Sequence, residues 1–197
     1  MAIKIFIDAG HNPGTINGGA YVDGYEEQAI NYTVASILAD LLDQDCRFAV
    51  RTSRNTPEQV LGTDTVTSLQ ERVDMANAWP ADFFFSIHCN YNDDPFISGS
   101  EIYVYQKDSI AWTMAQTILP IQCQIANTKN NRVRVDPALY VLRKTVMPAL
   151  LFELGYMTNE EDLYRLVNDP FSFAYGIYCG LLYYFLKVNS TTYPCFF

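Results

Sequence analysis

A regular alternation of short apolar runs with helical patterns is the feature that most constrains this chain of 197 residues. Residues 3–7 form a β-branched run that ends at a glycine-containing turn, which is typical of a buried strand. Residues 27–41 place apolar side chains at helical spacing, and residues 46–52 are typical of a second strand. Together they predict a βαβ unit, whose crossover is right-handed almost without exception.

The alternation continues to the end of the chain. We expect further strands at 83–87, 101–105, 140–142 and 149–152, and helices from residue 69, at 109–125 and at 171–188. Residues 55–67 hold a proline, a glycine and four threonines, which predicts a surface loop. Helix starts are expected at two capping-box spacings and one cap-proline pair, namely Asp23 with Glu26, Thr158 with Glu161, and Asp169 with Pro170.

This order of elements predicts the α/β class, with a single domain over residues 1–197. We expect a mainly parallel, mixed and twisted sheet of about six strands, with helices on both faces. Residues 187–197 are expected to form a short C-terminal tail. The five cysteines are widely spaced and form no C-x-x-C motif, which indicates neither a disulfide framework nor a zinc knuckle.

The charge balance restricts the partners. Thirteen basic against 22 acidic residues give a net charge of -9 at pH 7, the opposite of what a phosphate-binding protein carries, so we expect no nucleic-acid partner. The first residues lead directly into a strand, so we expect no signal peptide. Residues 171–188 are the most apolar stretch but include glycine, serine and tyrosine, so we expect a buried helix and no stable membrane insertion.

The chain contains two histidines, His11 and His88, and each is expected in a turn directly after a strand. Functional sites in such sheets form where the carboxyl ends of the strands meet. Two histidines need a third ligand to hold a catalytic zinc ion, and a carboxylate that leaves one position open for water is the common completion. The candidate carboxylates are Asp8, Glu26, Glu27 and Glu153.

These carboxylates allow alternative interpretations. Glu153 ends an apolar run, where a carboxylate is costly to bury unless it is paired or used. Glu26 and Glu27 fall in a first helical turn, where an acidic residue also favours the helix dipole without any further role. Glu27 and Glu153 are also compatible with the two carboxylates of a glycosidase, which leaves both histidines unexplained.

Several separated motifs occur in a familiar order. They are IDAGH at 7–11, EQAIN at 27–31, ADFFFSIHCN at 81–90, SGSEIYVY at 98–105 and YVLRKTVMPALLFELGYMTN at 140–159. Between the second and third, Leu69, Arg72, Ala76 and Asn77 follow a matching spacing. In these motifs the chain resembles the zinc-dependent N-acetylmuramoyl-L-alanine amidase catalytic domain, the third of the amidase families that cut bacterial peptidoglycan.

The resemblance implies that His11, Glu27 and His88 hold one zinc ion and that Glu153 is the catalytic carboxylate. Glu27 is preferred over Glu26 because the family has an asparagine four residues after the ligand, as Asn31 is here. The implied reaction is hydrolysis of the amide between the lactyl group of N-acetylmuramic acid and L-alanine of the stem peptide.

A non-catalytic peptidoglycan-binding protein on the same fold is the alternative. The resemblance implies action on the bacterial cell wall, as a phage lysin, a mother-cell enzyme or a fragment of an exported autolysin.

The chain departs from the family pattern at several positions. Ala9 stands where the family usually has proline and Asn12 where it has glycine, so we expect the first turn to differ in shape. Cys89 replaces an alanine, which is a small change, although a cysteine beside the candidate ligand His88 is also able to bind soft metals. The family's Arg-Gly pair appears at 131–134 as NRVR, without the glycine.

Overall fold

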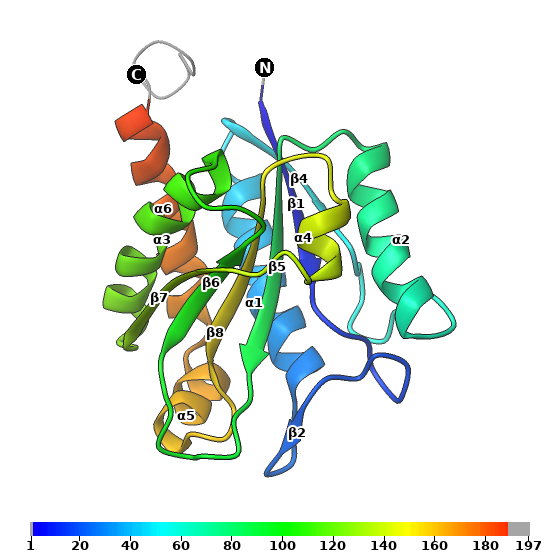
Figure 1. The fold of residues 1–197 in the computed structure, drawn as a ribbon, viewed down its shortest axis with the longest axis vertical. Helices are drawn as coiled ribbons and strands as arrows, with labels where there is room; N and C mark the ends of the chain where they lie inside the picture. The colour runs from blue at the N-terminus through cyan, green and yellow to red at the C-terminus, as the bar shows by residue number, and fades with distance from the viewer. Residues whose placement is uncertain (1, 189–197) are drawn as a thin grey trace.

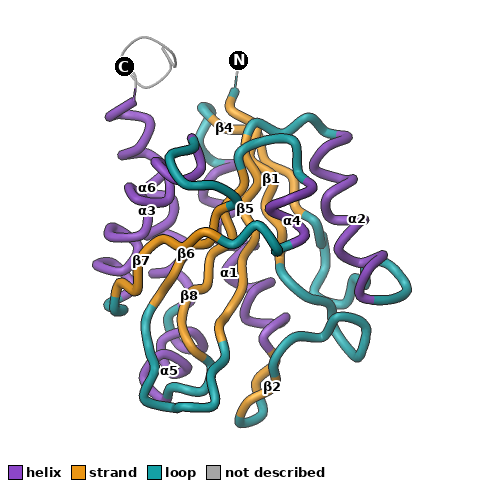
Figure 2. The backbone as a smooth tube through the Cα atoms, viewed as in Figure 1, coloured by secondary structure: helices purple, strands orange, loops and turns teal. Residues whose placement is uncertain are grey.

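The computed structural model describes residues 2–188, which fold around a central sheet with the strand order β4-β1-β5-β8-β6-β7 (Figures 1 and 2). Its strands are β1 (Ile3–Ala9), β4 (Phe48–Thr52), β5 (Phe83–Asn90), β6 (Ser100–Val104), β7 (Asn130–Val135) and β8 (Ala149–Tyr156). Neighbouring strands are parallel except β6 and β8, which are antiparallel. The expected mixed, mainly parallel sheet of about six strands is confirmed.

Helices cover both faces of the sheet, as expected (Figure 1). Within residues 2–188 they are α1 (Glu27–Asp43), α2 (Thr65–Ala78), α3 (Ile110–Ala126), α4 (Tyr140–Lys144), α5 (Glu160–Asn168) and α6 (Pro170–Val188). We call the face covered by α1, α3 and α6 the three-helix face, and the face covered by α2 and α4 the two-helix face. Each face has its own hydrophobic core.

A small hairpin precedes α1. It pairs β2 (Tyr21–Val22) with β3 (Tyr25–Glu26) through a turn at Asp23 and Gly24, whose φ angles are 51° and 89°. Two successive positive φ angles make a hairpin turn of type I′, for which Asp-Gly is a preferred pair. The expected helix cap at Asp23 is therefore wrong. The N-cap of α1 is Glu26, whose side chain makes no capping hydrogen bond.

Two other helix starts differ from expectation by a few residues. Asp64 and Thr67 form a reciprocal capping box, so α2 begins inside the expected 55–67 loop. The N-cap of α5 is Asn159, which accepts a hydrogen bond from the backbone of Asp162, so the expected cap at Thr158 is wrong by one residue. Both differences are small because the polar cap residues cluster and several spacings compete locally.

The expected strand at 140–142 is wrong, because these residues open helix α4. Val141 and Leu142 are buried in the core of the two-helix face, against α2. A run of three apolar residues does not distinguish a short helix from a strand, so the packing partner decides. The edge strand β7 was absent from the sequence expectation, since its alternation of arginine and valine is short and the strand is mostly exposed.

Helix α6 begins as expected, with the side chain of Asp169 accepting a hydrogen bond from the backbone of Ser172 at 3.2 Å. Two glycines let α6 approach α3 closely, since a Cβ at Gly180 would lie 2.7 Å from the Cα of Ile118. No helix in residues 2–188 is long and apolar enough to cross a membrane. Residues 187 and 188 of the expected tail close α6, and residues 189–197 lie outside the described residues.

Candidate metal centre

His11, Glu27 and His88 come together at the carboxyl edge of the sheet, although they lie far apart in the sequence. His11 follows β1, and Glu27 is the first residue of α1. His88 lies inside β5 rather than in a turn after it, because the strand continues to Asn90. One ligand atom from each of the three lies within 4.8 Å of the others.

The ligand atoms form a donor set that suits a metal ion. Glu27 Oε1 lies 3.2 Å from both His11 Nε2 and His88 Nδ1. The other ring nitrogen of His11, Nδ1, lies 3.1 Å from the backbone oxygen of Asn17. When a metal ion is bound, a proton on Nδ1 would be donated to that oxygen, which would leave the Nε2 lone pair for the ion. Two imidazoles and one carboxylate are a common donor set for catalytic zinc.

Two glycines make this convergence possible. A Cβ at Gly10 would lie 2.4 Å from His88 Nε2, and a Cβ at Gly19 would lie 2.7 Å from Glu27 Oε2. Both distances are shorter than any van der Waals contact, so a side chain at either position would displace a candidate ligand. The glycine of the IDAGH motif is therefore explained by the space that His88 needs.

Glu27 is surrounded by hydrogen-bond donors. Its Oε2 accepts from the backbone of Ala20 at 2.9 Å, and its Oε1 accepts from Asn31 Nδ2 and from the backbone of Cys89, both at 3.2 Å. Burial alone would raise the pKa of Glu27, but hydrogen bonds to the two histidines and their positive charge outweigh it and hold the pKa well below its ordinary value. The carboxylate is thus kept ionised, as a metal ligand must be.

Glu26 and Asp8, the other candidate ligands, lie outside the cluster. Glu26 accepts a hydrogen bond from Gln28 and is exposed. Asp8 is buried and accepts from the guanidinium of Arg72 and the hydroxyl of Ser86. Asp8 therefore supports the sheet beneath the cluster and contributes no metal ligand.

Glu153 lies beside His88, its partner in the parallel pairing of β5 with β8. Within the described residues its Oε2 atom is buried without any hydrogen-bond partner. Burial, together with the negative charges of Glu27 and Glu101, raises the pKa of Glu153 well above its ordinary value. A buried polar atom without a partner is rare in native structures and indicates a functional role or an unseen partner.

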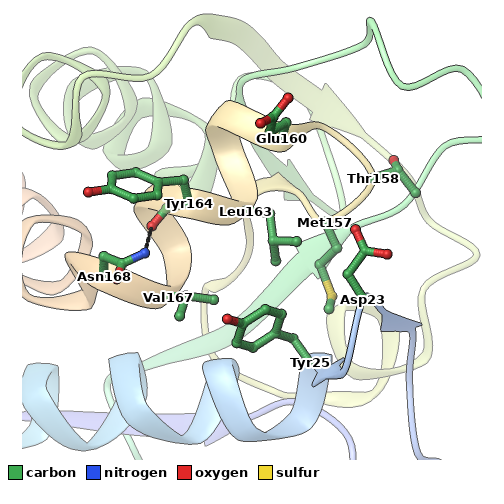
Figure 3. Close-up of a pocket in the computed structure, with 9 residues that line it drawn as sticks. All are labelled: Asp23, Tyr25, Met157, Thr158, Glu160, Leu163, Tyr164, Val167 and Asn168. Carbon is green, nitrogen blue, oxygen red and sulfur yellow. Dashed lines mark hydrogen bonds between the residues drawn. The ribbon is translucent and has the colours of Figure 1, made fainter.

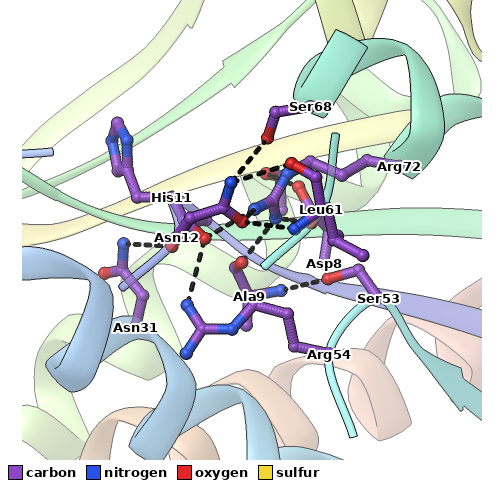
Figure 4. A network of polar contacts seen from close by, with 12 residues as sticks. Asp8, Ala9, His11, Asn12, Asn31, Ser53, Arg54, Leu61, Ser68 and Arg72 are labelled. Atoms are coloured by element: carbon purple, nitrogen blue, oxygen red, sulfur yellow. Dashed lines mark hydrogen bonds and ion pairs between the residues drawn. The ribbon is translucent and has the colours of Figure 1, made fainter. Parts of the chain in front are cut away.

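The turn that carries His11 is held by two buried arginines (Figure 4). His11 has a φ of 65°, in the left-handed region that disfavours residues other than glycine. Arg54 and Arg72 both donate to the backbone oxygen of His11. Their buried guanidinium groups therefore stabilise the backbone conformation that directs His11 at the centre.

Asn12, which replaces a family glycine, ties the same turn to the loop before α2 (Figure 4). Its side chain donates to the backbone oxygen of Leu61 at 2.9 Å and to Ser68 Oγ at 3.1 Å, and accepts from Arg72 at 2.9 Å. The loop and the first turn are therefore joined by side-chain bonds that a glycine lacks. The Cys89 side chain packs in the core of the three-helix face instead, so it adds no donor to the cluster.

The structure has one hollow at the cluster and another between the β2–β3 hairpin and α5. One, of about 130 Å³, touches both histidines and is otherwise walled mainly by apolar side chains of the two-helix face, including Leu69, Leu139 and Leu151. The other, of about 270 Å³, lies between the β2–β3 hairpin and α5 and includes Tyr25 and Tyr164 (Figure 3). Of these two hollows, the smaller one contacts the candidate ligands His11 and His88.

No sequence pattern singles out Arg54 or Asn17, and Arg72 appears only as one member of the spacing that begins at Leu69. An arginine in a loop is ordinarily exposed, and nothing in its neighbouring residues indicates that it will be buried beneath a turn 43 residues earlier. Nothing in the sequence indicates the left-handed backbone conformation of His11 either.

The chain is similar to known proteins along most of its length. The profile of the N-acetylmuramoyl-L-alanine amidase family matches residues 5–183. The N-acetylmuramoyl-L-alanine amidase CwlM of Bacillus licheniformis is 33% identical over 182 residues, which are 91% of this chain and 67% of CwlM. The sporulation-specific N-acetylmuramoyl-L-alanine amidase of Bacillus subtilis strain 168 is 32% identical over 193 residues, 96% of this chain and 71% of that relative.

A solved structure shares the fold. The catalytic domain of CwlV, an N-acetylmuramoyl-L-alanine amidase from Bacillus (Paenibacillus) polymyxa, superposes with a TM-score of 0.78 and 26% identity, over 95% of this chain and 99% of that domain. With the profile match over most of its length, this chain belongs to the N-acetylmuramoyl-L-alanine amidase family.

Proposed function

We propose that this chain is a zinc-dependent hydrolase that cuts the amide between the lactyl group of N-acetylmuramic acid and L-alanine in peptidoglycan stem peptides. In this proposal His11, Glu27 and His88 hold one zinc ion, and Glu153 is the catalytic carboxylate. The observation that carries it is the convergence of two imidazoles and a carboxylate beside a second, buried carboxylate with an unpartnered oxygen.

A zinc ion bound by these residues supplies Lewis acidity, which polarises a carbonyl group and makes water a better nucleophile near neutral pH. Glu153 accepts a proton from the attacking water and passes it to the nitrogen of the departing L-alanine. The C–N bond of the amide breaks, and the products are a lactyl carboxylate and a free α-amino group. A raised pKa suits this exchange, because the carboxyl group must both take and return a proton.

The glycosidase interpretation of Glu27 and Glu153 has less support. A glycosidase would use Glu27 as acid, base or nucleophile. Here the oxygens of Glu27 accept hydrogen bonds from Ala20, Asn31 and the backbone of Cys89, and both histidines face Oε1. Those contacts hold Glu27 ionised, so it has no proton to deliver, and they occupy both of its oxygens, so neither is free to attack a sugar or to activate water.

A digest of purified peptidoglycan with zinc-loaded protein tests the proposal. We expect new L-alanine amino termini, no new reducing sugar ends, and loss of both activity and bound zinc after treatment with a chelator. Glu153→Ala should retain zinc without hydrolysis, whereas His88→Ala should lose zinc. Full activity in either variant, or reducing ends instead of amino termini, contradicts the proposal.

Binding to muropeptides without any turnover would favour the non-catalytic alternative. The expected settings, a phage lysin, a mother-cell enzyme or an autolysin fragment, all bring the chain to bacterial peptidoglycan. The proposed site of action is therefore the cell wall in each case.

A further inference from the structure

Positive charge is concentrated in one segment of this acidic chain. Residues 129–144 hold five of the 13 basic residues but only one carboxylate, Asp136, whereas the whole chain has a net charge of -9. The segment forms β7 and α4, and in Figure 1 the connection between them passes across the two-helix face of the sheet. A local reversal of charge beside a candidate active site favours an anionic group in the ligand.

Arg134, on β7, is the member of this segment that is fixed in place. Its Nε lies 2.9 Å from Glu101 Oε2, and its Nη2 lies 3.0 Å from Glu101 Oε1. Glu101 is 2% exposed and also accepts hydrogen bonds from the hydroxyl groups of Tyr103 and Tyr156. The Glu101 carboxylate therefore has four donors, two from Arg134 and two from tyrosine hydroxyls. The Nε and Nη2 edge of the Arg134 guanidinium is held against it.

The other edge of that guanidinium is available. The Arg134 side chain is 52% exposed, and among residues 2–188 its Nη1 has no hydrogen-bond acceptor. An arginine held at one edge presents its remaining donors in a fixed plane, which suits the two oxygens of a carboxylate. Since Glu101 balances the charge of Arg134, the other basic residues of the segment supply the surplus positive potential.

Pairing across the sheet relates Arg134 to Glu153. Glu153 is the direct partner of Glu101 in the antiparallel β6–β8 pair, so both carboxylates are on the two-helix face. In the next strand, β7, Arg134 is the pairing partner of Tyr103 on β6. Adjacent strands lie about 4.8 Å apart, so the Glu101–Arg134 pair sits roughly 5 to 10 Å from Glu153.

A stem peptide matches this spacing. One residue of extended chain spans about 3.5 Å, so a carboxylate on the second residue lies roughly 5 to 8 Å beyond the amide that is cut. Where the second residue is acidic, its free carboxylate carries a negative charge, whereas the amide of that carboxylate carries none. We propose that Arg134, held by Glu101, is a specificity-determining residue that binds the free carboxylate of the second stem-peptide residue. This proposal rests on the amidase function proposed above.

The test compares two disaccharide muropeptides that differ only in a carboxylate or a carboxamide on the second residue. We expect the wild-type protein to favour the carboxylate form about tenfold in kcat/KM, since a half-exposed charge-assisted hydrogen bond is of that order. Arg134→Lys keeps a cation beside Glu101 but removes the planar fork, and we expect the preference to fall to about twofold. The ratio of the two rates is the readout, because partial unfolding lowers both equally.

Arg143→Lys is the matched control. Arg143 belongs to the same basic segment, but its guanidinium lies over the ring of Tyr140. The preference should stay at the wild-type value in this variant. Equal cleavage of both substrates by the wild type, an undiminished preference in Arg134→Lys, or an equal loss in Arg143→Lys would overturn the assignment. Cleavage of neither substrate by zinc-loaded wild type would instead overturn the amidase function itself.

Discussion

The two faces of the sheet are built from the same strands but differ in chemistry toward the carboxyl edge. On the three-helix face the strands remain apolar to their ends, with Ala9, Ile87 and Leu154 all buried. On the two-helix face the side chains begin apolar, at Phe6 and Phe84, and become polar at Asp8, His88 and Glu153. Alternation along each strand thus separates an apolar face from a face that carries the candidate site.

This difference explains how the fold tolerates its site. Buried carboxylates, buried arginines and a left-handed histidine each cost free energy. Three long helices packed on the continuous apolar face supply compensating burial, and α3 and α6 approach closely through Gly176 and Gly180. Substitutions at neighbouring positions of one strand should therefore separate activity from stability.

The largest effect is expected at Glu153. Glu153→Gln removes the group that we propose accepts the proton, so hydrolysis should fall by about 10²- to 10⁴-fold. Stability should stay the same or rise, because a buried carboxylate with an unpartnered oxygen is replaced by a neutral amide. Steady-state hydrolysis and urea unfolding of the same preparation measure both. A large loss of stability would show that Glu153 supports the fold, and would break the contrast between the faces.

Phe152, the preceding residue, points to the three-helix face and is fully buried against Phe85. Phe152→Ala should lower the free energy of unfolding by about 3 to 5 kcal/mol, because it removes a large side chain from a packed core. The kcat of the protein that remains folded should change little. Urea unfolding, with activity scaled to the folded fraction, checks this, and a selective loss of kcat would argue that the two faces are coupled.

Arg72→Met tests the buried charges beneath the site. It leaves Asp8 buried without its ion pair, and we expect a loss of about 3 kcal/mol at pH 7. Burial would raise the pKa of Asp8, but the charges of Arg72 and His88 and hydrogen bonds from two serine hydroxyls together outweigh it and lower the pKa. The wild-type contribution is therefore present above about pH 4 and is lost as pH falls.

In the Arg72 variant the unpaired carboxyl group should take up a proton more readily, so the difference from wild type should shrink toward acid pH. Urea unfolding at pH 7 and pH 4 measures this. The double variant with Asp8→Asn should regain part of the stability. An equal loss at both pH values would mean that Arg72 acts by packing rather than by charge.

The smallest effect is expected for a surface charge on the three-helix side. Asp45 binds Arg47 and the hydroxyl of Tyr178 on α6, and the Arg47 hydrogen bond lowers the pKa of Asp45 to about 2. Asp45→Asn should cost less than about 1 kcal/mol, because solvent screens the pair. The contribution is present above about pH 4 and is lost as pH falls through about 2. Thermal unfolding of Asp45→Asn at low and high salt measures this change in stability. A loss above about 1 kcal/mol would contradict the assumption that solvent screens the pair.

Much of the fold could be predicted because its signals are local. The β-branched runs of β1 and β5 and the helical spacing of α1 and α3 are each contained within a few consecutive residues. The prediction failed at α4 and at the Asp23 turn, where two short-range patterns compete. The Asp-Gly pair was a hairpin signal in the sequence that the capping-box interpretation overrode.

The sequence by itself determined the class of the fold, the family, and the four residues His11, Glu27, His88 and Glu153 as candidates, because motif order and periodicity are properties of the chain. Only the tertiary structure decided that Arg54 and Arg72 hold the His11 turn, that Cys89 faces away from the site, and that Glu101 secures Arg134 one strand beyond Glu153. The physical reason is that burial and charge pairing depend on residues distant in sequence, which meet only when the sheet assembles.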